Sequence, residues 1–137
     1  ETWEETGLLL AQPLPYGIPP TKRAPWDAFT ERGLAPALDC LDYIYRAVTP
    51  PGRPRRFNAR FFLADAANAS GELAGDGELL DLRWVPLDAA LSLPIPQVTH
   101  LVLEEVRRIM DTRPDTPKNR PLPRFQTVNG RFVFDHE

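Results

Sequence analysis

Proline limits where this chain can form long helices or central strands. The 137 residues include 16 prolines, and most of them fall in a few short segments. A proline ring removes a backbone donor and clashes with a preceding helical turn, so these segments must be turns, loops or element ends. Five prolines between Gln12 and Pro25 predict a long loop, either a substrate-contacting segment or simple disorder. Further prolines predict a break at residues 50–54, a strand end at Pro86 and a helix stop at Pro114.

Between these segments, the residue pattern predicts a mixed α/β fold. Stretches rich in β-branched and aromatic residues are typical of strands, and two of them flank the break at 50–54, which suggests a hairpin or a neighbouring pair. Strands are predicted at 41–49, 56–64 and 78–85, short helices at 26–32 and 87–91, and a glycine-rich loop at 68–77.

The clearest helix is predicted at residues 97–110. Apolar residues recur there every three or four positions, so one side of the helix should pack on a sheet together with Trp84. Glu104 and Glu105 are placed on the other side, and His100 is expected to be packed or solvated. The apolar positions are Val98, Leu101, Val102, Val106 and Ile109.

The last predicted element is a β-hairpin at residues 124–134. Asn129 and Gly130 lie between two apolar runs, and Asn-Gly is the preferred centre of a type I′ turn. This hairpin and the proline-rich loop are possible homodimer contacts.

Length and composition are those of one soluble domain with a substantial core. The net charge of −3 argues against nonspecific binding to nucleic-acid polymers or membranes, which needs a basic surface. No apolar run approaches the roughly 18 residues of a membrane span. Cys40 is the only cysteine, which excludes an internal disulfide and a thiolate metal cage, so a cytoplasmic location is expected.

The first seven residues contain three carboxylates at spacing i, i+3 and i+4. On a helix, Glu1, Glu4 and Glu5 share one side and repel one another unless a cation lies among them. Carboxylate oxygens suit Mg²⁺, Mn²⁺ or Ca²⁺. Gly7 falls where a helix would end, so the segment is expected to be the last turn of a helix that starts upstream. The alternative is a solvated face with intrahelical ion pairs, although no Lys or Arg lies four residues after Glu1 or Glu4.

The run from Glu1 to Leu8 resembles the second half of the Nudix box. That signature reads arginine, glutamate, hydrophobic, any residue, two glutamates, any residue, glycine and an aliphatic residue. Seven of these nine positions match; the arginine would precede Glu1, and Thr2 replaces a larger apolar residue. The resemblance implies that residues 1–137 are the C-terminal portion of a single Nudix domain, an α/β/α sandwich with a mixed sheet that is N-terminally incomplete here.

The resemblance also implies an activity. Nudix enzymes hydrolyse a diphosphate joined to a nucleoside or another group, and by position Glu1, Glu4 and Glu5 would bind Mg²⁺ or Mn²⁺, with Glu4 and Glu5 catalytic. A cation on the diphosphate oxygens neutralises developing charge and lowers the pKa of an attacking water. We therefore expect a diphosphatase acting on a nucleoside diphosphate derivative. The alternatives are a catalytically inactive Nudix-fold nucleotide-binding or regulatory module, and a structural domain with a coincidental acidic helix end.

Glu78 is a further catalytic candidate. It follows the glycine-rich loop, in a segment similar to the one that supplies a metal-reaching glutamate in some Nudix enzymes. It would act as a base on water or as another ligand. Glu72 and Asp76 compete for this role, and an exposed loop glutamate is the alternative.

A basic cluster, Arg53, Arg55, Arg56 and Arg60, is a candidate substrate-binding group. Guanidinium groups match phosphate oxygens, so the first three would hold the anionic end of a small diphosphate substrate. On a strand, Arg56 and Arg60 would share one face, and Phe57 and Phe61 would lie on the other. The alternative is a solubilising loop that forms ion pairs with nearby acids.

Overall fold

The computed structural model describes residues 2–16, 26–75, 77–112, 120–129 and 131–136. The chain has a mixed α/β structure with two sheets, as expected, and it forms two compact units. The first unit contains residues 1–41 and 64–84, and the second contains residues 42–63 and 85–137. The expectation of one domain stays a prediction.

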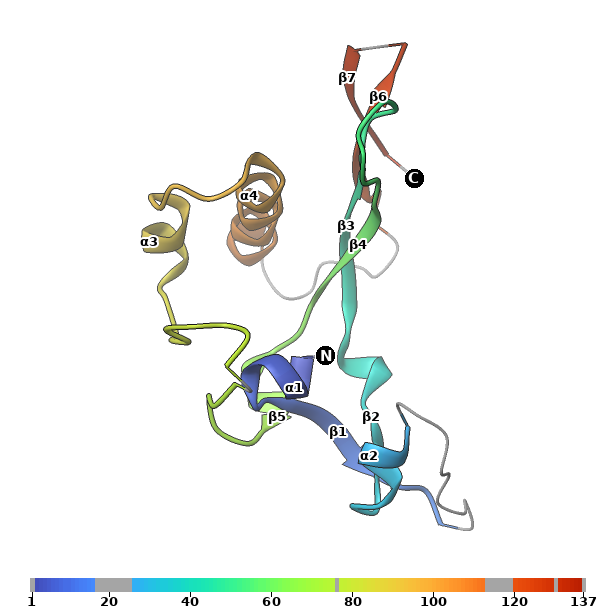
Figure 1. Cartoon of the computed structure of the whole chain (residues 1–137), viewed down its shortest axis with the longest axis vertical. Coiled ribbons are helices and arrows are strands. Elements are labelled where there is room, and N and C mark those ends of the chain that lie inside the picture. The colour runs from blue at the N-terminus through green and yellow to red at the C-terminus, as the bar shows by residue number, and fades with distance from the viewer. Residues whose placement is uncertain (1, 17–25, 76, 113–119, 130, 137) are drawn as a thin grey trace. The chain divides into compact units, whose positions relative to one another are not determined.

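In the first unit, a short helix runs directly into a three-stranded antiparallel sheet of order β2-β1-β5 (Figure 1). Leu10 of the central strand pairs with Ala69, and Gln12 pairs with Ala35. The elements are α1 (Thr2–Thr6), β1 (Leu9–Pro13), α2 (Asp27–Thr30), β2 (Leu34–Pro36), the 3₁₀ helices Leu38–Cys40 and Ala66–Asn68, and β5 (Ala69–Ser70).

The second unit contains a four-stranded mixed sheet of order β4-β3-β6-β7. Strands β3 and β6 are parallel, whereas the pairs β3–β4 and β6–β7 are antiparallel. The bounds are β3 (Asp42–Val48), β4 (Asn58–Leu63), α3 (Leu87–Leu91), α4 (Gln97–Thr112), β6 (Pro123–Val128) and β7 (Arg131–His136). The predicted pair of strands, the two helices and the terminal hairpin are thus confirmed, and Asn129 has the positive φ of 51° that the turn requires.

The core of the second unit lies between β3, β6 and α4. Ile44 and Tyr45 of β3 and Phe125 of β6 form one buried cluster with Val102 and Ile109 of α4. The helix therefore packs on the sheet through its predicted apolar side.

Three sequence predictions are wrong. Residues 78–85 form no strand, because Asp81 has a left-handed φ of 59° and no neighbouring strand covers the segment. Trp84 is consequently 67% exposed instead of lying in the core. Glu105 lies on the buried side of α4, at 7% exposure, because Arg108 neutralises its charge there.

The proline-rich stretch also begins later than predicted. Gln12 and Pro13 belong to β1, and Pro13 fits because β5 pairs only with Leu9 and Leu10, so that β2 is the one strand partner at Pro13 among the described residues. The rest of the predicted loop, at residues 17–25, and the predicted helix stop at Pro114 lie outside the described residues. Among the residues described, no helix is both long and apolar enough to cross a membrane.

Candidate functional site

Glu4 and Glu5 of the Nudix-like run lie on α1, which ends just before Gly7 as predicted. The Gly7 N–H donates to the Trp3 carbonyl oxygen at 2.8 Å, and Gly7 has a φ of +72°. The Thr6 hydroxyl donates to the Thr2 carbonyl oxygen and accepts a bond from the Leu8 N–H at 3.2 Å. These bonds satisfy backbone groups at the end of the helix and set the direction in which the chain enters β1.

The loop at residues 71–75 packs directly against this helix end. The Ala74 N–H donates to the Thr6 carbonyl oxygen at 3.1 Å. A Cβ on Gly7 would overlap the Glu72 carbonyl oxygen and lie 2.8 Å from the Ala74 carbonyl oxygen. The backbones can approach this closely only because Gly7 has no side chain.

Two more glycines are needed at the same contact. A Cβ on Gly71 would overlap the Gly7 carbonyl oxygen, and a Cβ on Gly75 would overlap the Glu5 carbonyl oxygen. The backbone of the predicted glycine-rich loop therefore packs directly against the end of α1. The sequence predicted the loop but not its contact with α1. The available signal for this contact was the pair Gly71 and Gly75, four residues apart.

Within α1, Glu4 is exposed and Glu5 is half-buried. The last turn of the helix contains no basic residue. A cation does lie beside the helix, because the Arg32 guanidinium carbon is 4.6 Å from the centre of the Trp3 ring. This contact joins the segment after α2 to α1 through a cation–π interaction.

Glu78 belongs to the same unit as α1. It is exposed and follows Gly77, whose φ is +99°. Glu4, Glu5 and Glu78 do not gather into one ligand group: among the described residues, no three His, Cys, Asp or Glu side chains could hold a metal ion together. The predicted set of Glu1, Glu4 and Glu5 includes Glu1, which lies outside the described residues.

The donor chemistry of α1 fits a hard divalent ion. Glu4 and Glu5 offer carboxylate oxygens that are at least partly accessible, which are the atoms that Mg²⁺ and Mn²⁺ prefer. Glu1, three residues before Glu4 in the sequence, would supply a third carboxylate. The residues therefore fit such an ion by donor type.

The predicted arginines lie in the second unit, so the structure does not place them against α1. Arg53 and Arg55 are exposed in the connection between β3 and β4, and the Arg56 Nε donates to the Thr49 carbonyl oxygen at 3.3 Å. Arg60 lies on the exposed face of β4, opposite the half-buried Phe61, as expected, but Arg56 and Phe57 precede this strand and are both exposed. The described ion pairs include none of these four residues, so the alternative of local ion pairs has no support in the described part of the chain.

A buried polar group on α4 was missed by sequence reasoning. The Arg108 Nε and Nη2 donate to the two Glu105 oxygens at 2.9 and 2.6 Å, and this hydrogen bonding raises the pKa of Arg108. Burial, followed by the charges of Glu105 and Glu104, raises the pKa of Tyr45 on β3. The i, i+3 spacing of Glu105 and Arg108 was the available signal. By contrast, His100 is partly exposed, as expected, with its Nδ1 3.7 Å from Glu104.

No family model, curated protein or solved structure matches the chain. A functional assignment therefore depends on the Nudix-like run at residues 1–8 and on the geometry around it.

Proposed function

We propose that this chain is part of a Nudix-type hydrolase that cleaves a diphosphate linkage in a nucleoside diphosphate derivative with Mg²⁺ or Mn²⁺. One observation carries the proposal: glutamates at positions 1, 4 and 5 precede a glycine that the structure requires. Gly7 has a left-handed φ and contacts the backbone of the loop at 71–75. The backbone geometry therefore requires a glycine at position 7, the position at which the motif has one.

In this proposal, Glu1, Glu4 and Glu5 hold the ion, with Glu4 and Glu5 serving the reaction directly. When bound, the ion supplies charge neutralisation on the diphosphate and acidifies a coordinated water. The protein's own contribution is to fix the end of α1, since the Ala74 N–H bonds its last carbonyl oxygen and Gly7 admits the loop. Glu78 would accept a proton from water if substrate binding brought it within hydrogen-bond reach.

The finer features of the fold and cell location belong to this proposal as well. The mixed sheet with α4 on one face supports part of an α/β/α sandwich, within a single Nudix domain. A single cysteine supports a cytoplasmic location. The arginines at 53, 55 and 56 would bind the anionic end of the substrate, which is supported by their exposure.

The test compares Glu4→Gln and Glu5→Gln with the unchanged protein on a panel of diphosphate compounds plus Mg²⁺. Replacing a residue that supports a metal ligand typically lowers metal affinity or activity by about 10 to 100-fold. Losing a ligand itself should therefore lower kcat/KM by more than about 100-fold. Glu31→Gln, a change of another exposed glutamate in the same unit, is the matched control and should keep full activity. Unchanged turnover in both ligand variants would remove the basis of the assignment.

A nucleotide-binding module without hydrolysis is the second candidate. It is favoured by the fact that Glu4, Glu5 and Glu78 do not form one ligand group among the described residues. It predicts that diphosphate compounds bind and are recovered intact after incubation with Mg²⁺ or Mn²⁺. Product analysis of the same panel separates it from the enzyme.

A further inference from the structure

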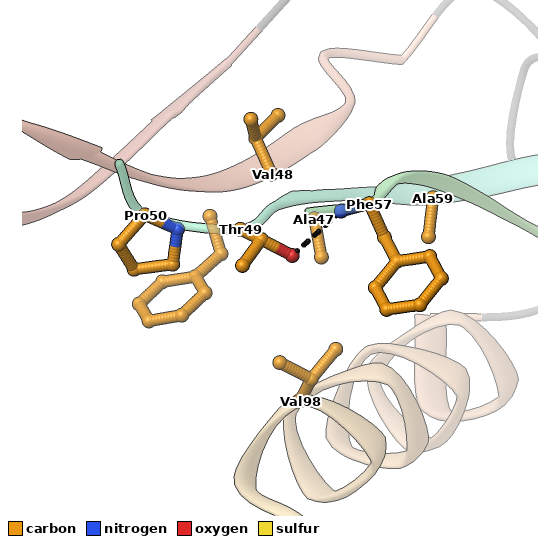
Figure 2. A pocket seen from close by; sticks show the side chains of 8 residues that line it. Ala47, Val48, Thr49, Pro50, Phe57, Ala59 and Val98 are labelled. Carbon is orange, nitrogen blue, oxygen red and sulfur yellow. Dashed lines mark hydrogen bonds between the residues drawn. The ribbon is translucent and has the colours of Figure 1, made fainter. Parts of the chain in front are cut away.

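The second unit contains an apolar pocket of about 340 Å³ at one end of the β3–β4 pair. The lining includes residues 47–50 of β3 and the following turn, then Phe57 and Ala59. Figure 2 shows Val98 of α4 facing Ala47, Phe57 and Ala59, whereas the Val48 side chain points to the other side of the strand. Phe125 of β6 completes the lining. Ala47 and Phe125 are buried, whereas Phe57 is 65% exposed, so the pocket extends from the core to an open mouth.

The walls of this pocket are almost entirely hydrocarbon. Thr49 is the only lining residue with a polar side chain, and its Oγ1 accepts a hydrogen bond from the Phe57 N–H at 2.9 Å. The Thr49 N–H donates back to the Phe57 carbonyl oxygen at 2.9 Å, which holds the two sides of the turn together. A ligand group that needs several hydrogen bonds, such as a nucleobase edge, would lose them on entry, whereas a hydrocarbon ring or short chain would not.

The mouth of the pocket is positively charged. Arg56 contacts a lining residue, since its Nε donates a hydrogen bond to the Thr49 carbonyl oxygen at 3.3 Å. Arg53 and Arg55 lie in the same turn, are exposed, and take part in none of the ion pairs found among the described residues. Guanidinium groups without carboxylate partners are available for a phosphate or carboxylate.

We propose that this pocket binds a small anion that carries a hydrocarbon ring or short chain, the hydrocarbon in the pocket and the anionic group on Arg56. The volume is at the lower end of the range for small-molecule sites, which excludes a long chain. Apolar burial supplies affinity, and the arginine selects an anion. The same arginines are proposed above to bind the anionic end of a diphosphate substrate, but the binding proposed here needs no hydrolysis and no metal ion, because the pocket and its arginines all belong to the second unit.

The test measures binding of 1-naphthyl phosphate to the full chain by calorimetry. The probe has no diphosphate linkage, so its binding does not depend on the proposed hydrolase activity. Three comparison compounds separate the contributions: 1-naphthol lacks the charge, inorganic phosphate lacks the rings, and adenosine monophosphate carries a polar base. We expect each of them to bind at least about tenfold more weakly than 1-naphthyl phosphate. Equal affinity for adenosine monophosphate or for phosphate alone would overturn the proposed ligand class.

Two variants locate the site. Ala59→Leu fills the pocket, and Arg56→Gln removes the charge at an exposed position that leaves the core unchanged. Each should weaken 1-naphthyl phosphate by about tenfold, and Arg56→Gln should leave the binding of 1-naphthol unchanged. Arg131→Gln, at an exposed arginine of β7, is the matched control and should bind like the unchanged protein. Normal binding by Ala59→Leu would show that the pocket is not the site, and normal binding by Arg56→Gln would show that Arg56 does not hold the anionic group.

Discussion

Arg124 and Asp135 form a paired, two-point contact across β6 and β7. The Arg124 Nε and Nη2 donate to the two Asp135 oxygens at 2.8 and 2.7 Å, and Gln126 donates to the same carboxylate at 2.8 Å. Arg124 and Asp135 are also direct partners in the strand register. The hydrogen bond from Arg124, followed by that from Gln126, lowers the pKa of Asp135 below its ordinary 3.8.

This contact predicts how acid affects the hairpin. Because the folded-state pKa of Asp135 is lowered, its contribution to stability is present above pH 3.8 and is lost as the pH falls through the lowered value. Asp135→Asn should therefore lower the melting temperature at pH 7, and the difference from the unchanged protein should shrink towards zero in acid. Thermal melts from pH 7 to strongly acidic pH check this, with Asp39→Asn as an exposed control. A difference that stayed constant across this range would contradict the prediction.

The buried carboxylate on α4 predicts a strong asymmetry between two neighbouring arginines. Arg108→Gln leaves Glu105 buried without its two-point partner, and we expect a loss of about 2 kcal/mol in the free energy of unfolding. Arg107→Gln changes an exposed residue and should cost less than about 0.5 kcal/mol. Urea unfolding of the two variants measures both values. Equal costs would mean that the pair with Glu105 contributes nothing.

Tyr45 predicts a stabilising substitution. Its hydroxyl is buried and has no hydrogen-bond partner among the described residues, while its ring packs in the core. Tyr45→Phe keeps the ring and removes the unpaired group, so the free energy of unfolding should rise by about 1 kcal/mol. Tyr43→Phe, at a half-buried tyrosine of the same strand, should not stabilise the protein.

The same substitution has a pH signature. The raised pKa of Tyr45 means that the folded state retains its proton longer than the unfolded state, so the unchanged protein loses stability as the pH rises past 10.0. Tyr45→Phe lacks this loss, and its advantage should widen in that range. Urea unfolding below and above pH 10.0 gives the comparison, and an advantage that narrowed would be inconsistent with burial of the neutral phenol.

Gly7 and Gly33 test whether the end of α1 needs a glycine for space as well as for conformation. Both have a left-handed φ, +72° and +68°, but a Cβ on Gly33 would meet nothing within 4 Å. Gly33→Ala should cost about 1 kcal/mol for the backbone conformation alone. Gly7→Ala adds the overlap with Glu72 and should cost clearly more in urea unfolding. Equal costs would show that the loop at 71–75 can move away freely.

Local patterns predicted the second unit well. The helical spacing in α4, the strands on either side of residues 50–57 and the turn at Asn129 depend mainly on neighbouring residues, which a sequence displays directly. Glu105 was assigned to the wrong side because its burial depends on a partner, Arg108, and on the fit of α4 against Tyr45.

Long-range pairing explains most of what was missed in the first unit. Strands β2 and β5 have only three and two residues, too short for a recognisable pattern, and they exist through pairing with β1. The apolar residues at 78–85 alternate as in a strand, yet Asp81 turns the backbone and no partner strand is present. For the candidate site, the sequence showed the glutamates and the glycine-rich loop, but the contact between Gly7, Gly71 and Gly75 required three-dimensional coordinates.

The parallel pairing of β3 with β6 has a consequence for the order of assembly. Asp42, the first residue of β3, and Arg120 before β6 are 78 residues apart and form an ion pair at 3.0 Å, and residues 64–84 of the first unit lie between them in the sequence. The β3–β4 hairpin leaves the ribosome before α4 and β6, and its apolar face is covered only when these elements have been made. We therefore expect the second unit to fold late and slowly. Closing so long a loop costs conformational entropy before the contacts of the core can stabilise the unit.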